Sequence, residues 1–295
     1  MARLRILYRD VDRTPYLYVL RDAAVALGLE LELVRASFQD NYVGALLDGR
    51  VDVLAENYWG LQSLAAEGAP LVSVATTVTH LNETLIVMPD IERLDQLAGA
   101  KLAMRAHGPS ALVAKLWLDE SGPPGMVGHE VGEALHGRWG NWKAVASGEC
   151  QAAFVTNILT SDPFTAGLTA LPIDRFDCLV NLTLTTRLDV INDRADAVRQ
   201  LVASAFVATR TFREDRDATL AILQREPQQL LNVDHARLGE LYEILRDELA
   251  PTPVPTAAAI DHTYRMRLSD NPELTNFNPL TMWDLRFARE VGHRV

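Results

Sequence analysis

The chain has 295 residues, a length that suits one large domain or two medium ones. Apolar residues make up 48% and charged residues 23%, which excludes a disordered or fibrous chain. The 28 Lys and Arg against 39 Asp and Glu give a net charge of -11. Because an acidic surface repels phosphate backbones and anionic lipids, we expect no nucleic-acid partner and no binding to membrane surfaces.

Metal and cofactor motifs are missing from the sequence. The two cysteines, Cys150 and Cys178, are too few for a disulfide framework or a four-ligand zinc site. The histidines have no metal-ligand spacing, and no glycine-rich nucleotide motif or nucleophile elbow occurs. We therefore predict no metal and no cofactor.

The N-terminus bears on location. Met1-Ala2-Arg3 leads into an apolar stretch that is too short for a secretory signal, and no apolar run reaches about 18 residues. We therefore expect no membrane span. As written, the sequence predicts a cytoplasmic protein; it would be periplasmic or lipid-anchored if a leader had been removed.

Short β-rich segments alternate with helical patterns over the first 78 residues. The alternation predicts a parallel sheet covered by helices. The expected strands are Leu4–Tyr8, Leu29–Val34, Val51–Ala55 and Leu71–Val78. The expected helices are Pro15–Leu27, Asp40–Leu47 and Leu61–Glu67.

The same alternation continues, and the C-terminal part then becomes helical. The further strands expected are Glu83–Met88, Lys101–Arg105, Val127–Val131, Gln151–Val155, Leu168–Pro172 and Cys178–Thr185. The further helices expected are Ile91–Ala98, Pro109–Glu120, Trp142–Ser147, Arg194–Glu214, Ala218–Gln224, Asp234–Glu248, Ala257–Arg267 and Leu280–Val291.

One pattern occurs twice. Ala45–Val53 resembles Ala144–Ala152, since each contains a helix end, a glycine and the start of a strand. Any helix-to-strand junction tends to have a glycine there, so the likeness has a local explanation. If the repeat is real, it predicts two similar α/β lobes in tandem.

Four longer segments carry a family resemblance. ALLDGRVDVLAE, LAAEGAPLVSVATTV, LDQLAGAKLAM and LTLTTRLDVINDRADAVRQLVASAFVATRTFRED resemble the type II periplasmic binding proteins. The branch in question includes the nitrate, sulfonate or taurine, and thiamine-precursor binding proteins. The resemblance covers most of residues 4–225, and its motifs are diffuse.

The resemblance implies an α/β fold of two lobes joined by two hinge strands, with the ligand held in the cleft between them. Lobe 1 would comprise residues 1–81 and 184–295, with the C-terminal helices packed on it, and lobe 2 would comprise residues 82–183. The crossovers would fall near Val78–Glu83 and Asn181–Thr186. An exported member would work with an ABC permease.

Enzymes with this fold form the alternative, because a fold does not fix a function. They include a desulfinase, a dihydroxyphthalate decarboxylase, chorismate dehydratase and the thiamine-pyrimidine synthases. The cysteine-rich motif of the synthases is absent here, and the loop after the first strand lacks the cysteine that the desulfinase uses.

In open α/β sheets, ligands bind beyond the carboxyl ends of the strands, which points to the loops there. After the first strand, Arg9 and Asp10 could hold an anion or relay a proton, or could simply pair with their neighbours. After the third strand, Glu56 could bind an amine or act as a base, Asn57 could hydrogen-bond a ligand, and Tyr58 and Trp59 could stack on it. The alternative is that Trp59 caps the core.

The first crossover contains His80 and Asn82. The family geometry would place them at the cleft, where a histidine is able to act as an acid, a base or a ligand donor near neutral pH. A hydrogen-bonded structural role for His80 is the alternative.

A second anion site is predicted at Arg105, His107, Gly108 and Ser110, where a strand is followed by a helix beginning at Pro109. An ordinary strand-to-helix turn with an exposed Arg105 would explain the same residues.

Three later residues complete the candidate ligand-binding set. Trp142 lies three residues after Trp139, which suits either a core stripe or a stacking wall for an aromatic ligand. Thr156 and Asn157 end a later strand and could donate hydrogen bonds to a ligand.

Two main hypotheses follow. The first is a binding protein for a small organic anion or heterocycle. The second is a cytoplasmic lyase or decarboxylase acting on an aromatic or small carboxylate, with Asp10, Glu56, His80 and His107 as proton-transfer candidates. A ligand-sensing or structural protein without turnover is a third.

Overall fold

The computed structural model describes residues 1–9, 14–37, 41–56, 58–81, 83–106, 108–132, 140–156, 162–179, 182–231 and 234–292. The chain forms two compact units. Unit 1 contains Met1–Thr79, Cys178–Tyr264 and Asn271–Val295. Unit 2 contains His80–Asp177 and Arg265–Asp270.

The two connections between the units run antiparallel to each other. His80 forms an isolated antiparallel bridge with Asp177, and the Cys178 amide donates to the Thr79 carbonyl at 3.1 Å. The chain thus returns to unit 1 at Cys178, six residues before the predicted boundary at residue 184. The physical reason is that the following strand, Thr183–Arg187, pairs entirely within the sheet of unit 1.

The sheet of unit 1 has the strand order β2-β1-β3-β10-β4. Its strands are β1 (Ala2–Tyr8), β2 (Leu29–Arg35), β3 (Val53–Glu56), β4 (Leu71–Thr76) and β10 (Thr183–Arg187). Strand β1 pairs in parallel with β2 and β3, whereas β10 runs antiparallel to β3 and β4. The carboxyl ends of β1 and β3 therefore lie at the same edge of the sheet.

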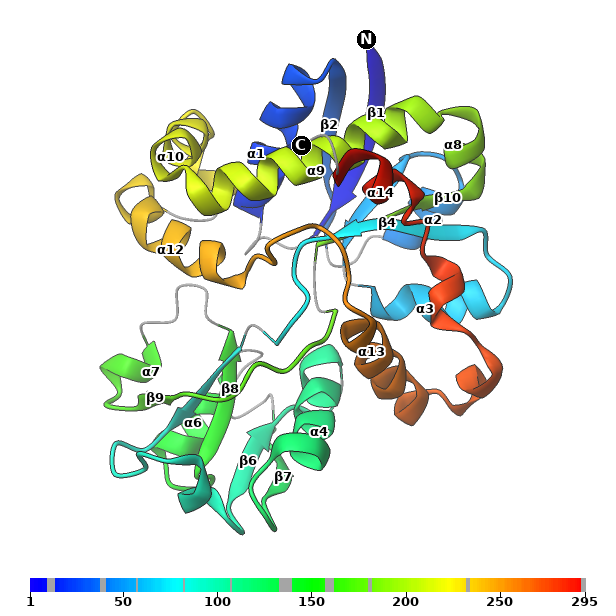
Figure 1. Cartoon of the computed structure of the whole chain (residues 1–295). Coiled ribbons are helices and arrows are strands. Elements are labelled where there is room, and N and C mark those ends of the chain that lie inside the picture. Colours follow the sequence, from blue (N-terminus) through cyan, green and yellow to red (C-terminus); the bar gives the residue numbers. More distant parts are fainter. Residues whose placement is uncertain are drawn as a thin grey trace. The chain divides into compact units, whose positions relative to one another are not determined.

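The long helix α9 (Ala195–Glu214) packs against α1 (Thr14–Ala26) and α14 (Arg286–Gly292) (Figure 1). The apolar side chains of α9 recur at helical spacing and are buried, as an amphipathic core helix requires. The other helical segments of unit 1 are α2 (Tyr42–Leu47), α3 (Trp59–Ala66), α8 (Leu188–Asp193), α10 (Arg216–Gln224), α11 (Gln228–Leu231), η2 (His235–Arg237), α12 (Leu238–Glu248), η3 (Pro272–Asn276) and η4 (Pro279–Met282).

Helix α13 (Ala257–Asp270) contributes to both units. Its residues Ala259 and Ile260 join a core cluster of unit 1 that also contains Leu7 of β1 and Leu54 of β3. Since successive strand residues point to opposite faces, Leu7 and its neighbour Ile6 show that both faces of this sheet are covered.

The sheet of unit 2 has the strand order β7-β6-β8-β5-β9. Its strands are β5 (Glu83–Val87), β6 (Lys101–Met104), β7 (Val127–Glu130), β8 (Ala152–Thr156) and β9 (Thr169–Leu171). Its helical segments are η1 (Leu94–Leu97), α4 (Pro109–Ser121), α6 (Asn141–Ala146) and α7 (Asp162–Thr165). Strand β6 is parallel to β7 and β8, and β5 is antiparallel to β8 and β9.

The two sheets have the same topology, as the repeated sequence pattern predicts. In unit 1, β1 lies between its parallel partners β2 and β3, and the antiparallel strand β10 follows β3. In unit 2, β6 lies in the same way between β7 and β8, and the antiparallel strand β5 follows β8. At the two matched junctions, Gly49 and Gly148 have positive φ angles of 73° and 79°. The residue two positions after each glycine donates its amide into the preceding helix, Val51 to Ala45 and Cys150 to Ala144.

The last predicted helix is interrupted. Residues Leu280–Val291 form η4, a short extended segment and then α14, rather than one helix. Trp283 makes a parallel bridge with Ser73 of β4, and the Asp284 amide donates to the Ser73 carbonyl at 3.0 Å. Pairing with the open edge of β4 thus competes successfully with helix continuation.

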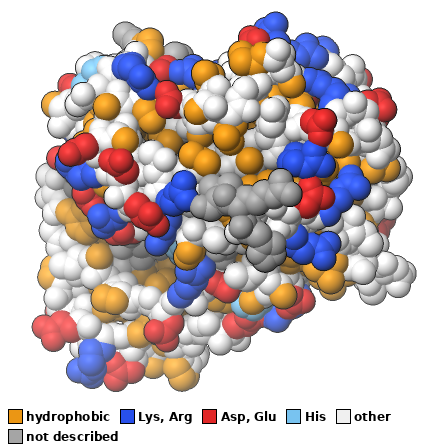
Figure 2. Space-filling view, turned by 45° about the horizontal axis from the view of Figure 1, so that its top comes forward, with side chains coloured by type: hydrophobic (Ala, Val, Ile, Leu, Met, Phe, Trp, Pro, Cys, Tyr) orange, Lys and Arg blue, Asp and Glu red, His pale blue; other side chains and the backbone are white. Residues whose placement is uncertain are grey.

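Basic and acidic side chains lie next to each other over much of the face shown in Figure 2. Among the described residues, exposed ion pairs include Arg225 with Asp22 and Arg237 with Glu240. Within the described part of the chain, no helix is both long and apolar enough to cross a bilayer.

Candidate functional site

Unit 1 brings Arg9 and Glu56 together at the carboxyl edge of its sheet. Arg9 directly follows β1, and Glu56 is the last residue of the adjacent strand β3. Arg9 Nε donates to Glu56 Oε1 at 3.1 Å, and Arg9 Nη2 donates to Glu56 Oε2 at 3.2 Å. The two parallel hydrogen bonds fix the plane of the guanidinium.

Tyr42, at the start of α2, completes this cluster. The guanidinium carbon of Arg9 lies 3.7 Å from the centre of the Tyr42 ring, in a cation–π arrangement. The Glu56 side chain is only 5% exposed and that of Arg9 20% exposed. The cluster is therefore a largely buried, pre-organised cation with its counter-ion.

Charge pairing outweighs burial at Arg9. Burial alone would lower the pKa of the guanidinium, but the hydrogen bond and the charge of Glu56 raise it above its ordinary value. For the Tyr42 hydroxyl, burial has the opposite effect and raises the pKa, although the positive charge of Arg9 opposes this change. Both groups therefore keep their ordinary protonation at neutral pH.

Unit 2 presents Arg105, Ser110 and Thr156 at the corresponding edge. Arg105 directly follows β6, and Thr156 ends β8 in register with Glu83 of β5. Ser110, in the first turn of α4, donates its hydroxyl to Glu83 Oε1 at 2.9 Å. Gly108 is the N-cap of α4, with a φ of 96° that favours glycine.

The repeated topology makes Arg9 and Arg105 equivalent residues. Ile6 of β1 pairs with Val53 of β3, and Leu102 of β6 makes the corresponding pair with Ala152 of β8. Arg9 lies three residues after Ile6, and Arg105 lies three residues after Leu102. Each unit thus carries one arginine immediately beyond the carboxyl end of its first parallel strand.

The aromatic candidates of unit 1 have packing partners within that unit. Tyr58 is fully buried and accepts a hydrogen bond from Trp283 Nε1 at 3.0 Å. Trp59 is 3% exposed, and its Nε1 donates to the Leu179 carbonyl at 3.0 Å. The Trp59 contact agrees with the alternative in which this ring caps the core, and ligand contact by either ring stays a prediction.

Trp142 and His80 also have structural partners. Trp142, in α6, packs against the core cluster of unit 2 that contains Ala144 and Val155. His80 lies in the first connection between the units, where it forms an isolated antiparallel β-bridge with Asp177. The remaining candidates, Asp10, Asn57, Asn82, His107 and Asn157, lie outside the described residues.

Two residues of these edges were missed by the sequence analysis. Tyr42 follows the loop after β2, so the same rule about strand ends would have selected it. Glu83 is the first residue of β5, which runs antiparallel to β8, so Glu83 pairs with Thr156, the last residue of β8. Finding Glu83 required the strand direction, which the local sequence does not encode.

Within the described residues, no group of three or more His, Cys, Asp or Glu side chains is arranged to hold a metal. Both cysteines are buried, and neither forms a disulfide. Burial, together with the negative charge of Glu149, raises the pKa of the Cys150 thiol to about 11, which keeps it protonated and unreactive at neutral pH.

No protein-family model matches the sequence, and no curated protein matches it. Solved structures do match. A periplasmic sulfonate-binding protein of a sulfonate ABC transporter from Methylobacillus flagellatus KT superposes with a TM-score of 0.68 at 14% identity, covering 99% of this chain and 94% of that one.

The periplasmic aliphatic sulphonate binding protein of Escherichia coli has a TM-score of 0.64 at 15% identity, over 92% of this chain and 88% of its own. A desulfurization enzyme has a TM-score of 0.62 at 16% identity, over 99% of both chains. At these identities the likeness concerns the fold. Together with the two sheets of identical topology, it shows that the chain has the two-lobed fold of the periplasmic binding proteins.

Proposed function

We propose that this protein binds a small organic anion and releases it unchanged. The observation that carries the proposal is the equivalent placement of Arg9 and Arg105, one beyond the first parallel strand of each unit. Ligands of open α/β sheets bind at this edge, and the guanidinium fork matches carboxylate and sulfonate oxygens. Solved proteins of the same fold that are described as sulfonate-binding support the same class of ligand.

The Arg9 cluster is suited to binding rather than to proton transfer. Glu56 accepts two hydrogen bonds from the Arg9 guanidinium, and the Tyr42 ring covers that guanidinium. Both carboxylate oxygens of Glu56 are engaged by Arg9, and the side chain is only 5% exposed. Glu56 is therefore better placed to hold Arg9 in position than to act as the base of a lyase.

The proposed partner is the permease of an ABC importer. The two sulfonate-binding structures reported above are described as periplasmic, and one of them as part of an ABC transporter. In this role the protein would work outside the cytoplasmic membrane. Cell fractionation of the native host would test that location, and a protein found only in the cytoplasm would contradict it.

The direct test is calorimetric titration with ethanesulfonate, benzenesulfonate, propionate and benzoate, with native mass spectrometry of co-purified small molecules. For a probe that binds, Arg105→Gln should weaken affinity about ten- to a hundredfold, as expected for charge-assisted hydrogen bonds. The double variant Arg9→Gln/Glu56→Gln should do the same while replacing the ion pair with a neutral hydrogen-bonding pair. Arg93→Gln, an exposed arginine in unit 2, is the charge-matched control.

Two results would contradict the proposal. Unchanged affinity in both arginine variants would remove the assigned residues. Recovery of a chemically altered probe after incubation would show turnover and favour the enzyme hypothesis instead.

A further inference from the structure

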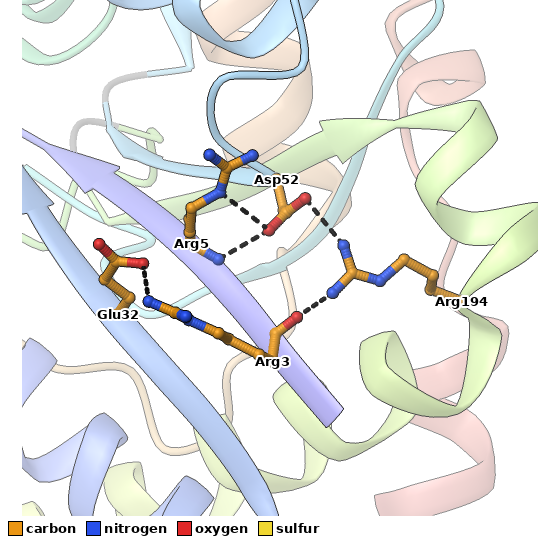
Figure 3. Close-up of a pocket in the computed structure, with 5 residues that line it drawn as sticks. All are labelled: Arg3, Arg5, Glu32, Asp52 and Arg194. Carbon is orange, nitrogen blue, oxygen red and sulfur yellow. Dashed lines mark hydrogen bonds and ion pairs between the residues drawn. The ribbon is translucent and has the colours of Figure 1, made fainter. Parts of the chain in front are cut away.

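A cavity of about 500 Å³ lies toward the amino end of β1, away from the edge that carries Arg9 and Glu56. Its walls are formed by charged side chains (Figure 3). The lining residues are Arg3, Arg5, Glu32, Asp52 and Arg194.

Asp52 holds two of the arginines in place. Asp52 is only 7% exposed, and its Oδ1 accepts a hydrogen bond from Arg194 Nη1 at 2.8 Å. Its Oδ2 accepts a hydrogen bond from the Arg5 backbone amide at 2.8 Å and lies 3.8 Å from Arg5 Nε. Arg5 Nη2 also donates to the Gly49 carbonyl at 2.7 Å, and Arg194 Nη2 donates to the Arg3 carbonyl. Both guanidinium groups are thus positioned before any ligand binds.

The local charge is unbalanced at this pair. Arg3 turns toward two exposed acids, with Nη2 at 2.6 Å from Glu32 and Nε at 3.5 Å from Glu30. Arg5 and Arg194 share the single carboxylate of Asp52, which leaves one positive charge between them. Their side chains remain 40% and 36% exposed, so a solute can reach them.

Unit 2 shows which part of this arrangement the fold itself needs. At the position equivalent to Asp52, Gln151 accepts from the backbone amide of Lys101 at 2.9 Å, as Asp52 does from Arg5. A neutral side chain is therefore sufficient for that hydrogen bond. In unit 1 the Asp52 carboxylate also accepts from Arg194 and lies 3.8 Å from Arg5 Nε, so it stands between these two guanidinium groups (Figure 3).

We propose that this cavity is a second binding site, for a small tetrahedral oxoanion such as phosphate or sulfate or for the phosphoryl group of a larger molecule. The anion lies against Arg5 and Arg194, because each guanidinium has five N–H groups and the intramolecular bonds of these two use only some of them. Phosphate oxygens match the guanidinium fork, whereas Arg3, which pairs with Glu30 and Glu32, adds no net positive charge. The site is independent of the proposed organic-anion site, which uses the opposite edge of the sheet.

The test is a titration with inorganic phosphate in which calorimetry and phosphorus NMR measure binding. Sodium chloride is added to keep the ionic strength constant. We expect saturable binding that Arg194→Gln weakens about tenfold or more. Glu32→Gln removes a negative charge from the cavity without removing a donor, so it should tighten phosphate binding several-fold. Arg93→Gln carries the same charge change as Arg194→Gln outside the cavity and should leave phosphate affinity unchanged.

Circular dichroism checks that each variant is folded. If Arg194→Gln does not fold, the effect of Glu32→Gln on phosphate affinity tests the proposal by itself. Glycerol 3-phosphate forms a second arm: tighter binding than phosphate identifies the phosphoryl group of a larger molecule as the occupant, and equal binding identifies the free ion. A response to phosphate no larger than that to chloride, or no effect of Glu32→Gln, would overturn the proposal. Ethanesulfonate binding unaffected by Arg194→Gln would show that the two sites are separate.

Discussion

At the residue scale, the candidate side chains divide into charged groups at strand ends and rings in the core. Arg9 and Arg105 directly follow strands, and the guanidinium of Arg9 pairs with Glu56. Tyr58 and Trp59 come only two and three residues after the end of β3, yet both are buried. Sequence position near a strand end therefore selects the right loop but does not tell which side chain turns inward.

Trp59→Phe separates packing from ligand contact. Loss of the hydrogen bond to the Leu179 carbonyl, together with the smaller ring, should lower the free energy of unfolding by about 1–3 kcal/mol. Affinity for an organic-anion probe should stay within about twofold of the native value. Urea unfolding and calorimetry measure the two effects, and weaker binding at unchanged stability would show that Trp59 contacts the ligand.

Tyr58 makes stability fall at alkaline pH. Burial raises the pKa of its hydroxyl from 10.0 to about 12, so the folded state keeps the proton over a range in which the unfolded state loses it. The contribution is complete below pH 10 and is lost as the pH rises toward 12.

Tyr58→Phe should therefore be less stable than the native chain at pH 8, by about 1 kcal/mol, because the hydrogen bond from Trp283 is lost. At pH 11 the difference should change by about 1.4 kcal/mol in favour of the variant, since phenylalanine has no proton to lose, so Tyr58→Phe should be at least as stable as the native chain. Urea unfolding at the two pH values measures the change. A deficit that is the same at both would contradict the assignment.

At the element scale, the two helix-to-strand junctions follow one design. Gly49 and Gly148 both have positive φ angles, and the flanking amide hydrogen bonds match one for one. A side chain in this conformation is strained by its own backbone, which explains why the repeated pattern contains glycine at this place. The sequence repeat reflects a shared local geometry.

Gly148→Ala should lower the free energy of unfolding by about 1 kcal/mol, because its φ is 79°. An added Cβ would meet no atom within 4 Å, so the cost comes from the backbone alone. Gly132→Ala is the control, since a Cβ there also meets nothing within 4 Å and its φ lies outside the left-handed range. Equal stability of the two variants would show that φ at Gly148 is not under strain.

At the scale of the whole molecule, a ligand that binds only the folded protein must stabilise it. At a concentration about 100 times its Kd, an organic anion should raise the free energy of unfolding by about 2.7 kcal/mol. Thermal unfolding with increasing ligand measures this effect. The Arg9→Gln/Glu56→Gln variant should lose about half of the stabilisation or more, and an equal rise in that variant would place the ligand elsewhere.

Local patterns along the chain were enough to predict most strands and helices, the alternation that builds the parallel sheets, and the two arginines that follow β1 and β6. These features depend on the period of apolar residues and on glycine at junctions, which neighbouring residues encode. The resemblance to periplasmic binding proteins added the two lobes and the crossovers, which periodicity alone does not contain.

Long-range pairing decided the rest. The return to unit 1 at Cys178, the break before α14 and the placement of Glu83 beside Thr156 all arise from strands that meet far apart in sequence. The contact of Arg9 with Glu56 and the sharing of Asp52 by Arg5 and Arg194 have the same origin. A short stretch of sequence carries no record of these partners, because their free energy comes from hydrogen bonds and charges that become neighbours only when the sheet assembles.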